Sequence, residues 1–269
     1  MSRDNKDLDP AMDSDTTADA APSDIEPKTG HDAAGEFVEI IKTIVYALLI
    51  ALVLRVLLFQ PFTIPSGSMI PNLLIGDYII VSKYSYGYSK HSIPFSPDLF
   101  DGRIMERTPK RGDVVVFKTP KDNRTDYVKR LMGLPGDRIQ VRGGVVYING
   151  EALPQKNLGP DLENGVERIQ ETNPAGKSYV TQDMGDRDTD NTDVFTVPER
   201  MYFMMGDNRD NSLDSRVSPF AGGVGFVPAE NLVGKAQVVL FSWDEGASIF
   251  KPWTWFTKAR WGRFFHGVK

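Results

Sequence analysis

Residues 127–137 read Tyr-Val-Lys-Arg-Leu-Met-Gly-Leu-Pro-Gly-Asp and carry the clearest structural signal in the chain. The stretch predicts an apolar β-strand that ends in a tight turn at Pro135-Gly136. Lys129 lies in this strand with apolar residues on both sides, although an exposed Lys129-Arg130 pair is the simpler interpretation. A buried amine loses hydration, which favours its neutral form. The stretch therefore offers a strand and, inside it, a candidate general base.

Other short runs of β-branched and aromatic residues, broken by Gly, Pro and Asp, predict further strands. These runs are Tyr78–Val81, Val114–Phe117, Ile139–Val141, Val145–Ile148, Tyr202–Met205 and Ala236–Phe241. Arg142-Gly143-Gly144 is typical of a hairpin turn. The polar residues 151–193, with their Asp and Asn clusters, indicate a variable excursion. We expect the chain after residue 60 to be mostly β.

One segment is apolar enough to cross a membrane. Thr43–Phe59 contains a single charge, Arg55, and with the apolar residues before it the expected transmembrane helix covers 37–59. A buried core helix and a cleaved signal peptide are the alternatives. The preceding region is too long and too acidic for a signal peptide, and no Ala-x-Ala follows Phe59.

Basic residues near the segment predict its orientation. Lys28 and Lys42 precede it, and no Lys or Arg occurs between residues 60 and 82. The positive-inside rule then places the N-terminus in the cytoplasm and residues 60–269 outside it. No second apolar run of this length exists, so we expect a single-pass protein.

Charge is unevenly distributed between the two ends. The net charge is −5, yet residues 1–36 hold ten Asp and Glu, and residues 249–269 hold five Lys and Arg with no acid. The first 36 residues lack an apolar period and predict a disordered tail. The aromatic and basic residues 246–269 favour a membrane-proximal segment at an anionic lipid surface. An exposed helix end is the alternative for that segment.

Composition excludes several kinds of site. The chain has no cysteine, which rules out disulfides, thiolate catalysis and zinc ribbons. Its three histidines, His31, His91 and His266, do not lie beside a plausible nucleophile in the sequence. A Ser-His-Asp triad and a multi-histidine metal site are therefore not expected.

A candidate nucleophile follows the apolar segment. Residues 65–71 read Pro-Ser-Gly-Ser-Met-Ile-Pro, in which Pro65 restricts the backbone and Gly67 relaxes it. Such a turn can present the Ser68 hydroxyl and aim its backbone N–H and the Ser66 hydroxyl at a developing oxyanion. A plain Pro-Ser-Gly turn is the alternative. A serine needs a base to remove its proton, and Lys129 is the candidate.

A third polar stretch is too hydrophilic to form a core. Residues 206–216 read Gly-Asp-Asn-Arg-Asp-Asn-Ser-Leu-Asp-Ser-Arg. Calcium loops also alternate Asp and Asn, but this spacing lacks the terminal Glu ligand and includes two arginines. We expect a self-paired loop that braces a site, in which a hydroxyl such as that of Ser212 orients the lysine.

These three stretches, with residues 111–117 (Arg-Gly-Asp-Val-Val-Val-Phe) in order between them, resemble the bacterial type I signal peptidase family. The resemblance covers roughly residues 38–243. It implies a membrane-bound serine endopeptidase with a Ser/Lys dyad and a mostly-β catalytic fold in the periplasm. The catalytic β domain would comprise 60–140 and 200–245, with a smaller β subdomain inserted at 141–199. The family often has two membrane spans, whereas this chain shows one.

The resemblance also implies roles for individual residues. Ser68 would be the nucleophile and Lys129 the base, with Ser66 as oxyanion donor and Ser212 positioning the lysine. Asp207 with Arg130, and Asp214 with Arg216, resemble the family's structural ion pairs. Small substrate pockets would be walled by Phe62, Ile64, Met69, Leu73, Ile79, Val116, Tyr127 and Val128. Asn72 stands where the family usually has threonine, and Leu213 where a small residue is common.

The implied partners are secreted preproteins with signal peptides and the phospholipid bilayer of the bacterial inner membrane. No cofactor, metal or nucleic acid is implied. Two other functions stay open at this point. One is a Ser–Lys protease of another role, such as a cytoplasmic self-cleaving regulator. The other is a non-catalytic, membrane-anchored β domain that binds secreted polypeptides.

Overall fold

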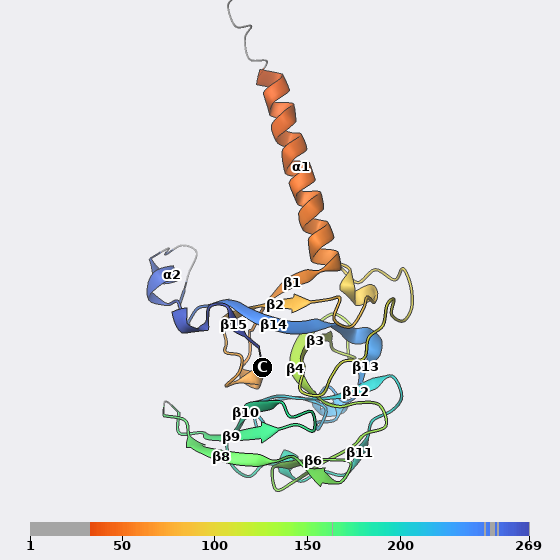
Figure 1. Cartoon of the computed structure of the whole chain (residues 1–269), viewed down its shortest axis with the longest axis vertical. Helices are drawn as coiled ribbons and strands as arrows, with labels where there is room; N and C mark the ends of the chain where they lie inside the picture. The colour runs from red at the N-terminus through yellow and green to blue at the C-terminus, as the bar shows by residue number, and fades with distance from the viewer. Residues whose placement is uncertain (1–32, 163, 245, 248–250, 252, 269) are drawn as a thin grey trace, which may run out of the picture. The chain divides into compact units, whose positions relative to one another are not determined.

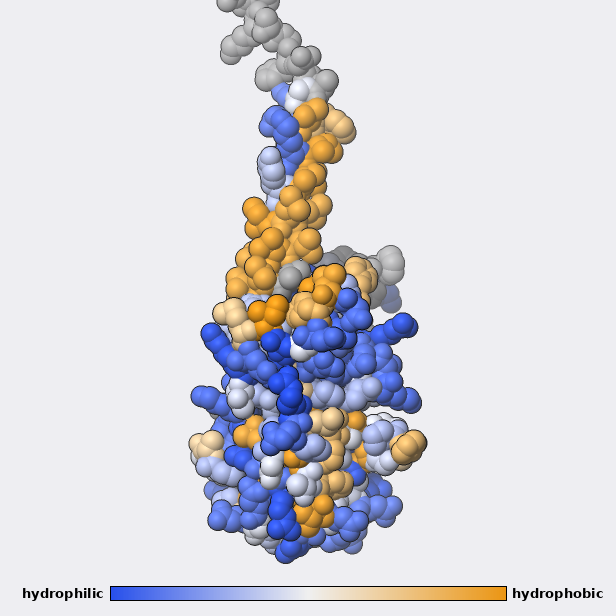
Figure 2. Space-filling view, turned by 90° about the vertical axis from the view of Figure 1, so that its right-hand side faces the viewer, coloured by the Kyte–Doolittle hydropathy of each residue, from blue (hydrophilic) through white to orange (hydrophobic). Residues whose placement is uncertain are grey.

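A computed structural model describes residues 33–162, 164–244, 246–247, 251 and 253–268. It begins with one long helix, α1 (Ala33–Leu57), whose only charges in the stretch Gly35–Arg55 lie near its two ends. That stretch has a mean hydropathy of 2.4 and is long enough to cross a membrane. Its side chains are exposed, and most of the helix surface in Figure 2 is apolar, with polar residues gathered toward its N-terminal end. A helix that is apolar all round is buried in protein or in lipid.

The helix limits differ slightly from the expected 37–59. Helix α1 starts at Ala33, so the last four residues of the expected acidic tail are helical. Alanine is a strong helix former, and Glu36 in the first turn favours the positive end of the helix dipole. The rest of that tail, residues 1–32, lies outside the described residues. At the other end the chain becomes a strand at Phe59, two residues before Pro61.

The chain divides into two compact units after Ala47, and the second, Leu48–Lys269, contains every strand of the described residues. Its largest sheet is mostly antiparallel and has the spatial order β1-β2-β14-β3-β4-β12-β13, with β15 paired to β14 (Figure 1). The strands are β1 (Phe59–Thr63), β2 (Asp77–Ser82), β3 (Val114–Lys118), β4 (Asp126–Gly133), β12 (Met201–Met205), β13 (Val227–Pro228), β14 (Leu232–Ser242) and β15 (His266–Gly267). Residues far apart in sequence thus become neighbours, which is how the sheet brings the polar stretches together.

Two smaller sheets are built from the residues between β4 and β12. One has the order β11-β5-β6-β7, and the other the order β10-β9-β8. Their strands are β5 (Arg138–Arg142), β6 (Val145–Ile148), β7 (Glu151–Ala152), β8 (Gln155–Pro160), β9 (Glu167–Thr172), β10 (Ser178–Asp183) and β11 (Phe195–Thr196). We call the sheet β8–β10 the accessory sheet. It lies within the polar excursion 151–193, for which no strand was predicted.

The mostly-β fold class is confirmed, and each of the six runs predicted as strands lies inside one. The predicted hairpin turn joins β5 to β6. Both Gly143 and Gly144 have positive φ, as the two central residues of a type I′ turn require. The division into a catalytic domain and an inserted subdomain with the stated boundaries stays a prediction.

Apolar side chains of the large sheet form two buried clusters. One gathers around Met69, Ile79 and Val239, and the other around Phe117, Leu131 and Met204. A third cluster, around Ile139, Val146 and Phe203, joins the β5–β7 hairpins to the large sheet. The strand β4 contributes Leu131 to one cluster and Met132 to another, since successive strand residues face opposite sides. This packing makes β4 a rigid support for Lys129.

The C-terminal segment is only partly the free basic surface that the sequence indicated. It contains a short helix, α2 (Thr254–Thr257), and two of its arginines pair with the fully buried Asp77 on β2. Arg263 Nη2 lies 2.5 Å from Asp77 Oδ2, and Arg260 Nη1 lies 3.7 Å from Asp77 Oδ1. A buried carboxylate requires such partners, so these charges hold the segment on the sheet. Trp253, Trp255 and Phe256 remain exposed.

Candidate active site

Ser68 lies in a short 3-10 helix, η1 (Gly67–Met69), that follows β1. Two buried side chains, Ile64 and Met69, anchor the chain on either side of it in the core. The turn is also held from outside. Asn208 donates its backbone N–H to Ser68 O at 3.1 Å and its side-chain amide to Gly67 O at 3.3 Å. Ser68 is therefore fixed by its own packing and by the loop 206–216.

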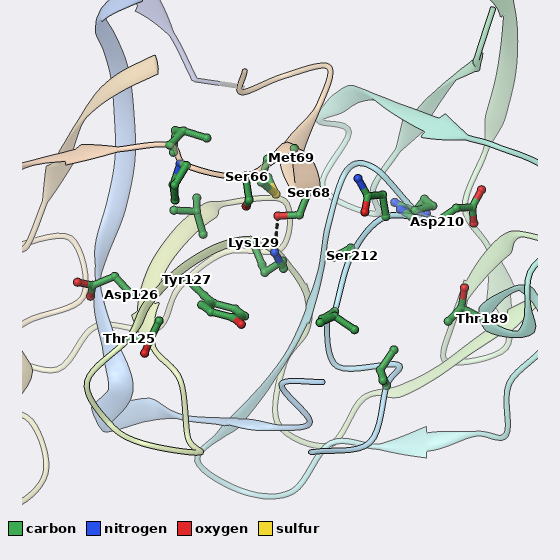
Figure 3. Close-up of a pocket in the computed structure, with 18 of the residues that line it drawn as sticks. Ser66, Ser68, Met69, Thr125, Asp126, Tyr127, Lys129, Thr189, Asp210 and Ser212 are labelled. Atoms are coloured by element: carbon green, nitrogen blue, oxygen red, sulfur yellow. Dashed lines mark hydrogen bonds between the residues drawn. The ribbon is translucent and has the colours of Figure 1, made fainter. Parts of the chain in front are cut away.

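Lys129 lies on β4 opposite Val115 of β3. Its Nζ donates a hydrogen bond of 2.6 Å to Ser68 Oγ, across a sequence separation of 61 residues (Figure 3). The lysine is only 4% exposed, and its Nζ lies 5.4 Å from the ring centroid of Tyr127. Nucleophile and base are thus within hydrogen-bond reach, which is the geometry that general-base activation of a serine requires.

Burial changes the protonation of Lys129. Loss of hydration lowers its pKa from 10.5 to about 8, while the carboxylates of Asp214 and Asp207 act in the opposite direction. Desolvation dominates because neither carboxylate touches the amine, and each is paired with an arginine of its own. Near neutral pH, a far larger fraction of Lys129 is therefore neutral and able to accept a proton than for an exposed lysine.

Two buried ion pairs brace the surroundings. Arg130 and Asp207 are both fully buried and meet at 2.6 Å, and Arg130 also donates to Gly112 O at 2.8 Å. Arg216 lies 2.9 Å from Asp214, whose Oδ2 accepts the backbone N–H of Gly206 at 3.0 Å. Since removing one member of such a pair strands a buried charge, both pairs fix the loop 206–216 strongly.

A cleft of about 900 Å³ opens around Ser68 and Lys129. Figure 3 shows Ser68 and Lys129 between two groups of residues, with Thr125, Asp126 and Tyr127 on one side and Thr189 and Asp210 on the other. The cleft is lined by Phe62–Met69, Thr125–Lys129, Arg187–Thr189, Arg209–Leu213 and Val217. It can hold an extended peptide segment with Ser68 facing one of its bonds.

A family model described as "Signal peptidase, peptidase S26" matches residues 37–243. The chain belongs to this family. It is 44% identical over 232 residues to "Signal peptidase I" of Rickettsia prowazekii (strain Madrid E), which covers 77% of this chain and 86% of the relative. The protein of the same name from Rickettsia typhi (strain ATCC VR-144 / Wilmington) matches with the same identity and coverage.

A solved structure of "a signal peptidase I (EF3073) from Enterococcus faecalis V583" is 28% identical, covering 48% of this chain and 97% of that one, with a TM-score of 0.31. As a member of the S26 family, the present chain is a hydrolase of the signal peptidase I type.

Among the residues expected in an S26 site, the structure brings together Ser66, Ser68, Lys129 and Ser212 along one cleft (Figure 3). The Ser66 side chain makes no capping hydrogen bond to η1. The expected hydrogen bond from Ser212 to Lys129 is not present. Ser212 Oγ is buried without a hydrogen-bond partner in the described residues, and it lies against Gly206, where an added Cβ would be 2.2 Å away. Its positioning role stays a prediction.

The expected pocket walls divide into two groups. Phe62, Ile64, Met69, Tyr127 and Val128 line the cleft. The other three, Leu73, Ile79 and Val116, are fully buried in the core cluster behind it and do not reach the surface of the cleft. Ile79 on β2, Val116 on β3 and Leu73 in the bend before β2 all pack into this cluster. Their influence on a pocket is through support of Ile64 and Met69.

Sequence reasoning missed one side of the cleft. Arg187, Asp188 and Thr189 follow β10 in a polar segment with no recognisable motif, and only the folding of the accessory sheet brings them to the cleft.

Asn72, which stands where the family usually has threonine, has a structural role. Its amide donates to Asp207 Oδ2 at 2.7 Å and to Val180 O at 2.6 Å, so it joins the buried ion pair to β10. Leu213 is 52% exposed at the cleft.

Proposed function

We propose that the chain is a membrane-bound serine endopeptidase that removes N-terminal signal peptides from secreted preproteins, with Ser68 as nucleophile and Lys129 as base. The observation that carries this proposal is the 2.6 Å contact between Lys129 Nζ and Ser68 Oγ inside the cleft. It is supported by the burial of Lys129, which lowers the pKa of its amine to about 8. Membership of the S26 family sets the substrate class.

The reaction would proceed by acyl transfer. Neutral Lys129 Nζ takes the Ser68 hydroxyl proton as Oγ attacks the scissile carbonyl carbon. The oxyanion of the tetrahedral intermediate accepts hydrogen bonds from the Ser68 backbone N–H and the Ser66 hydroxyl. Protonated Lys129 then gives its proton to the leaving amine, which departs as the N-terminus of the mature protein. Water, deprotonated by Lys129, hydrolyses the Ser68 ester and releases the signal peptide.

The membrane role rests on α1, whose apolar stretch Gly35–Arg55 meets the length and hydropathy of a membrane span. An enzyme anchored in this way meets substrates that are delivered to the same bilayer. Lys28 precedes the helix and Lys42 lies in its first half, so the positive-inside rule puts the strands that follow on the outer side of the inner membrane. The bilayer and the secreted preproteins are the proposed partners.

The proposed test is cleavage of a purified signal-peptide-bearing precursor by the full chain in detergent micelles. Ser68→Ala and Lys129→Ala should each abolish cleavage without unfolding the protein, because each removes one half of the nucleophile–base pair. Unfolding temperature measured on the same samples provides the control for folding. A Lys129→Ala protein that retains more than about a tenth of the wild-type rate would refute the proposed dyad.

Specificity should follow from the apolar walls of the cleft. Because Ile64, Met69 and Tyr127 lie beside Ser68, the site should accept Ala, Gly and Ser at the first and third positions before the scissile bond. A small pocket rejects bulky side chains by overpacking but grades small ones weakly, at about 1–3 kcal/mol per methylene. A precursor with Ala at the first position should therefore be cut quickly and one with Ser more slowly. A precursor with Phe there should not be cut. Cleavage of the Phe precursor at the same bond and rate would contradict the pocket assignment.

A further inference from the structure

The accessory sheet is connected to the nucleophile through one short loop. Asn208 holds the Ser68 turn through hydrogen bonds to Ser68 O and Gly67 O. On both sides of Asn208 the same loop is bonded to Gln182 at the end of β10. Gln182 donates its N–H to Asp207 O at 2.9 Å, and Arg209 donates its N–H to Gln182 O at 3.0 Å. The loop thus extends the accessory sheet as a short parallel bridge.

A buried ion pair fixes this bridge. Glu171, on the central strand β9, is fully buried, and both of its carboxylate oxygens accept hydrogen bonds from Arg209, at 2.6 Å and 2.5 Å. Arg209 is 7% exposed and also donates from Nε to Gly206 O at 3.2 Å. The carboxylate of Glu171 accepts a further hydrogen bond from Gln155 at 3.2 Å. A planar guanidinium held in this way cannot rotate without losing several charge-assisted bonds.

Glu171 lies outside the cleft that surrounds Ser68, and it is separated from Ser68 by Arg209 and Asn208. Any effect on the reaction therefore passes through the loop. The loop contains Asn208, which fixes the Ser68 carbonyl, and continues to Ser212 at the edge of the cleft. Because Asn208 is hydrogen-bonded to Ser68 O and Gly67 O, even a small displacement of this loop would also move η1.

We propose that Glu171 is a positioning residue of the accessory sheet, which holds the loop 206–212 through Arg209 and thereby keeps Ser68 in line with Lys129. The inference rests on the proposed Ser68/Lys129 dyad. The accessory sheet then contributes to catalysis, because Glu171 on its central strand holds Arg209, and the loop that contains Arg209 holds Ser68. Arg130 stacks on Tyr179 of β10 with 3.9 Å from its Cζ to the ring centroid, which adds a second link between this sheet and β4.

The test uses Glu171→Gln in the full chain in detergent micelles, with the same precursor. Glutamine keeps the size of the side chain but removes the charge and one of the two acceptor oxygens. We expect kcat to fall about 10- to 100-fold, because small misplacements of reacting groups cost rates of this order, with KM within about twofold. Hydrogen exchange of the peptide that contains Asn208–Leu213 should accelerate, since the Asn208 N–H bond to Ser68 O is weakened.

Asp137→Asn is the matched control. Asp137 is also a buried carboxylate, and both of its oxygens accept hydrogen bonds from one arginine, Arg111, but no hydrogen bond joins it to the loop 206–212. This variant should lose unfolding temperature to a similar degree while kcat and the exchange of Asn208–Leu213 stay at wild-type values. If Glu171→Gln fails to fold, the double variant Glu171→Gln/Arg209→Gln, which buries no unpaired charge, should show the same loss of kcat.

Wild-type kcat and wild-type loop exchange in a folded Glu171→Gln protein would overturn the positioning role. Equal losses of kcat in Glu171→Gln and Asp137→Asn would also overturn it, because the effect would then be general destabilisation. Ser68→Ala is measured in parallel. An active Ser68→Ala protein would instead refute the dyad, so the two failures are distinguishable.

Discussion

At the scale of a single residue, burial and the proposed role of Lys129 act in the same direction. Its position inside an apolar strand makes the charged amine unfavourable, and a general base must be neutral to accept a proton. Local sequence was sufficient to mark Lys129 and Ser68 as candidates, because each lies in a constrained, apolar-flanked stretch. Their contact was not predictable from spacing, since it depends on how β4 and the turn after β1 pack.

Activity should depend on pH through Lys129. Because the reactive form is the neutral amine and burial lowers its pKa to about 8, kcat/KM should rise as pH increases through about 8 and then level off. The measurement is a pH profile of precursor cleavage between pH 6 and 10, over which the protein is shown to stay folded. An acid limb that remains in place when hydrophobic neighbours such as Tyr127 are replaced by polar residues would contradict this cause.

Stability should respond to the same group. Between about pH 8 and the ordinary value of 10.5, the unfolded chain holds a proton on Lys129 that the folded chain has released. The free energy of unfolding should therefore rise with pH across this window. Urea titrations at pH 8 and pH 10 should show the rise in the wild type and a smaller one in Lys129→Met, which has no amine to titrate. Equal slopes in the two proteins would assign the rise to other groups.

At the scale of elements, the site is a junction of three segments that are distant in sequence. The 3-10 helix η1 carries Ser68, the strand β4 carries Lys129, and the loop 206–216 presses against both. Periodicity identified β4, and composition identified the loop as a brace. Neither could reveal that Gly206 lies directly against Ser68 O and the Ser212 side chain, because this depends on how the loop folds against η1.

Replacing Gly206 by alanine should disable the site. An added Cβ would lie 2.6 Å from Ser68 O and 2.5 Å from Ser212 Cβ, so the nucleophile turn or the loop must move. We expect a loss of kcat of at least about 100-fold and a destabilisation of about 1–3 kcal/mol from overpacking. Cleavage assays and thermal unfolding measure the two effects. The control is Gly262→Ala, whose Cβ meets no atom within 4 Å, and wild-type activity in Gly206→Ala would exclude the close approach.

At the scale of the whole molecule, α1 and the β unit serve separate purposes. The helix has a surface suited to lipid, whereas the β unit has its own buried clusters and its own cleft. Two arginines of the C-terminal segment pair with Asp77, whereas its aromatic residues Trp253 and Phe256 and its lysines Lys251 and Lys258 are exposed.

Topology in the membrane is testable on spheroplasts. Protease added from outside should degrade the strands after residue 58 and spare an epitope placed on residues 1–32, because the positive-inside rule predicts that Lys28 and Lys42 favour a cytoplasmic location for the N-terminal end of α1. Detergent-lysed spheroplasts, in which both parts become accessible, are the control. Digestion of the epitope in intact spheroplasts would reverse the orientation and remove the basis for acting on exported proteins.

The sequence by itself determined the apolar helix and the mostly-β character, and it marked Ser68 and Lys129 as the candidate nucleophile and base. These features depend on local composition, on the alternation of apolar and polar residues and on short motifs, none of which requires knowledge of distant contacts. The tertiary structure alone decided that Leu73, Ile79 and Val116 lie behind the cleft, and that the accessory sheet reaches it. The physical reason is that burial and contact depend on pairing between distant strands. A polar segment such as β8–β10 carries little signal in its own sequence, because its place is set by pairing between its strands and by the buried Glu171–Arg209 pair.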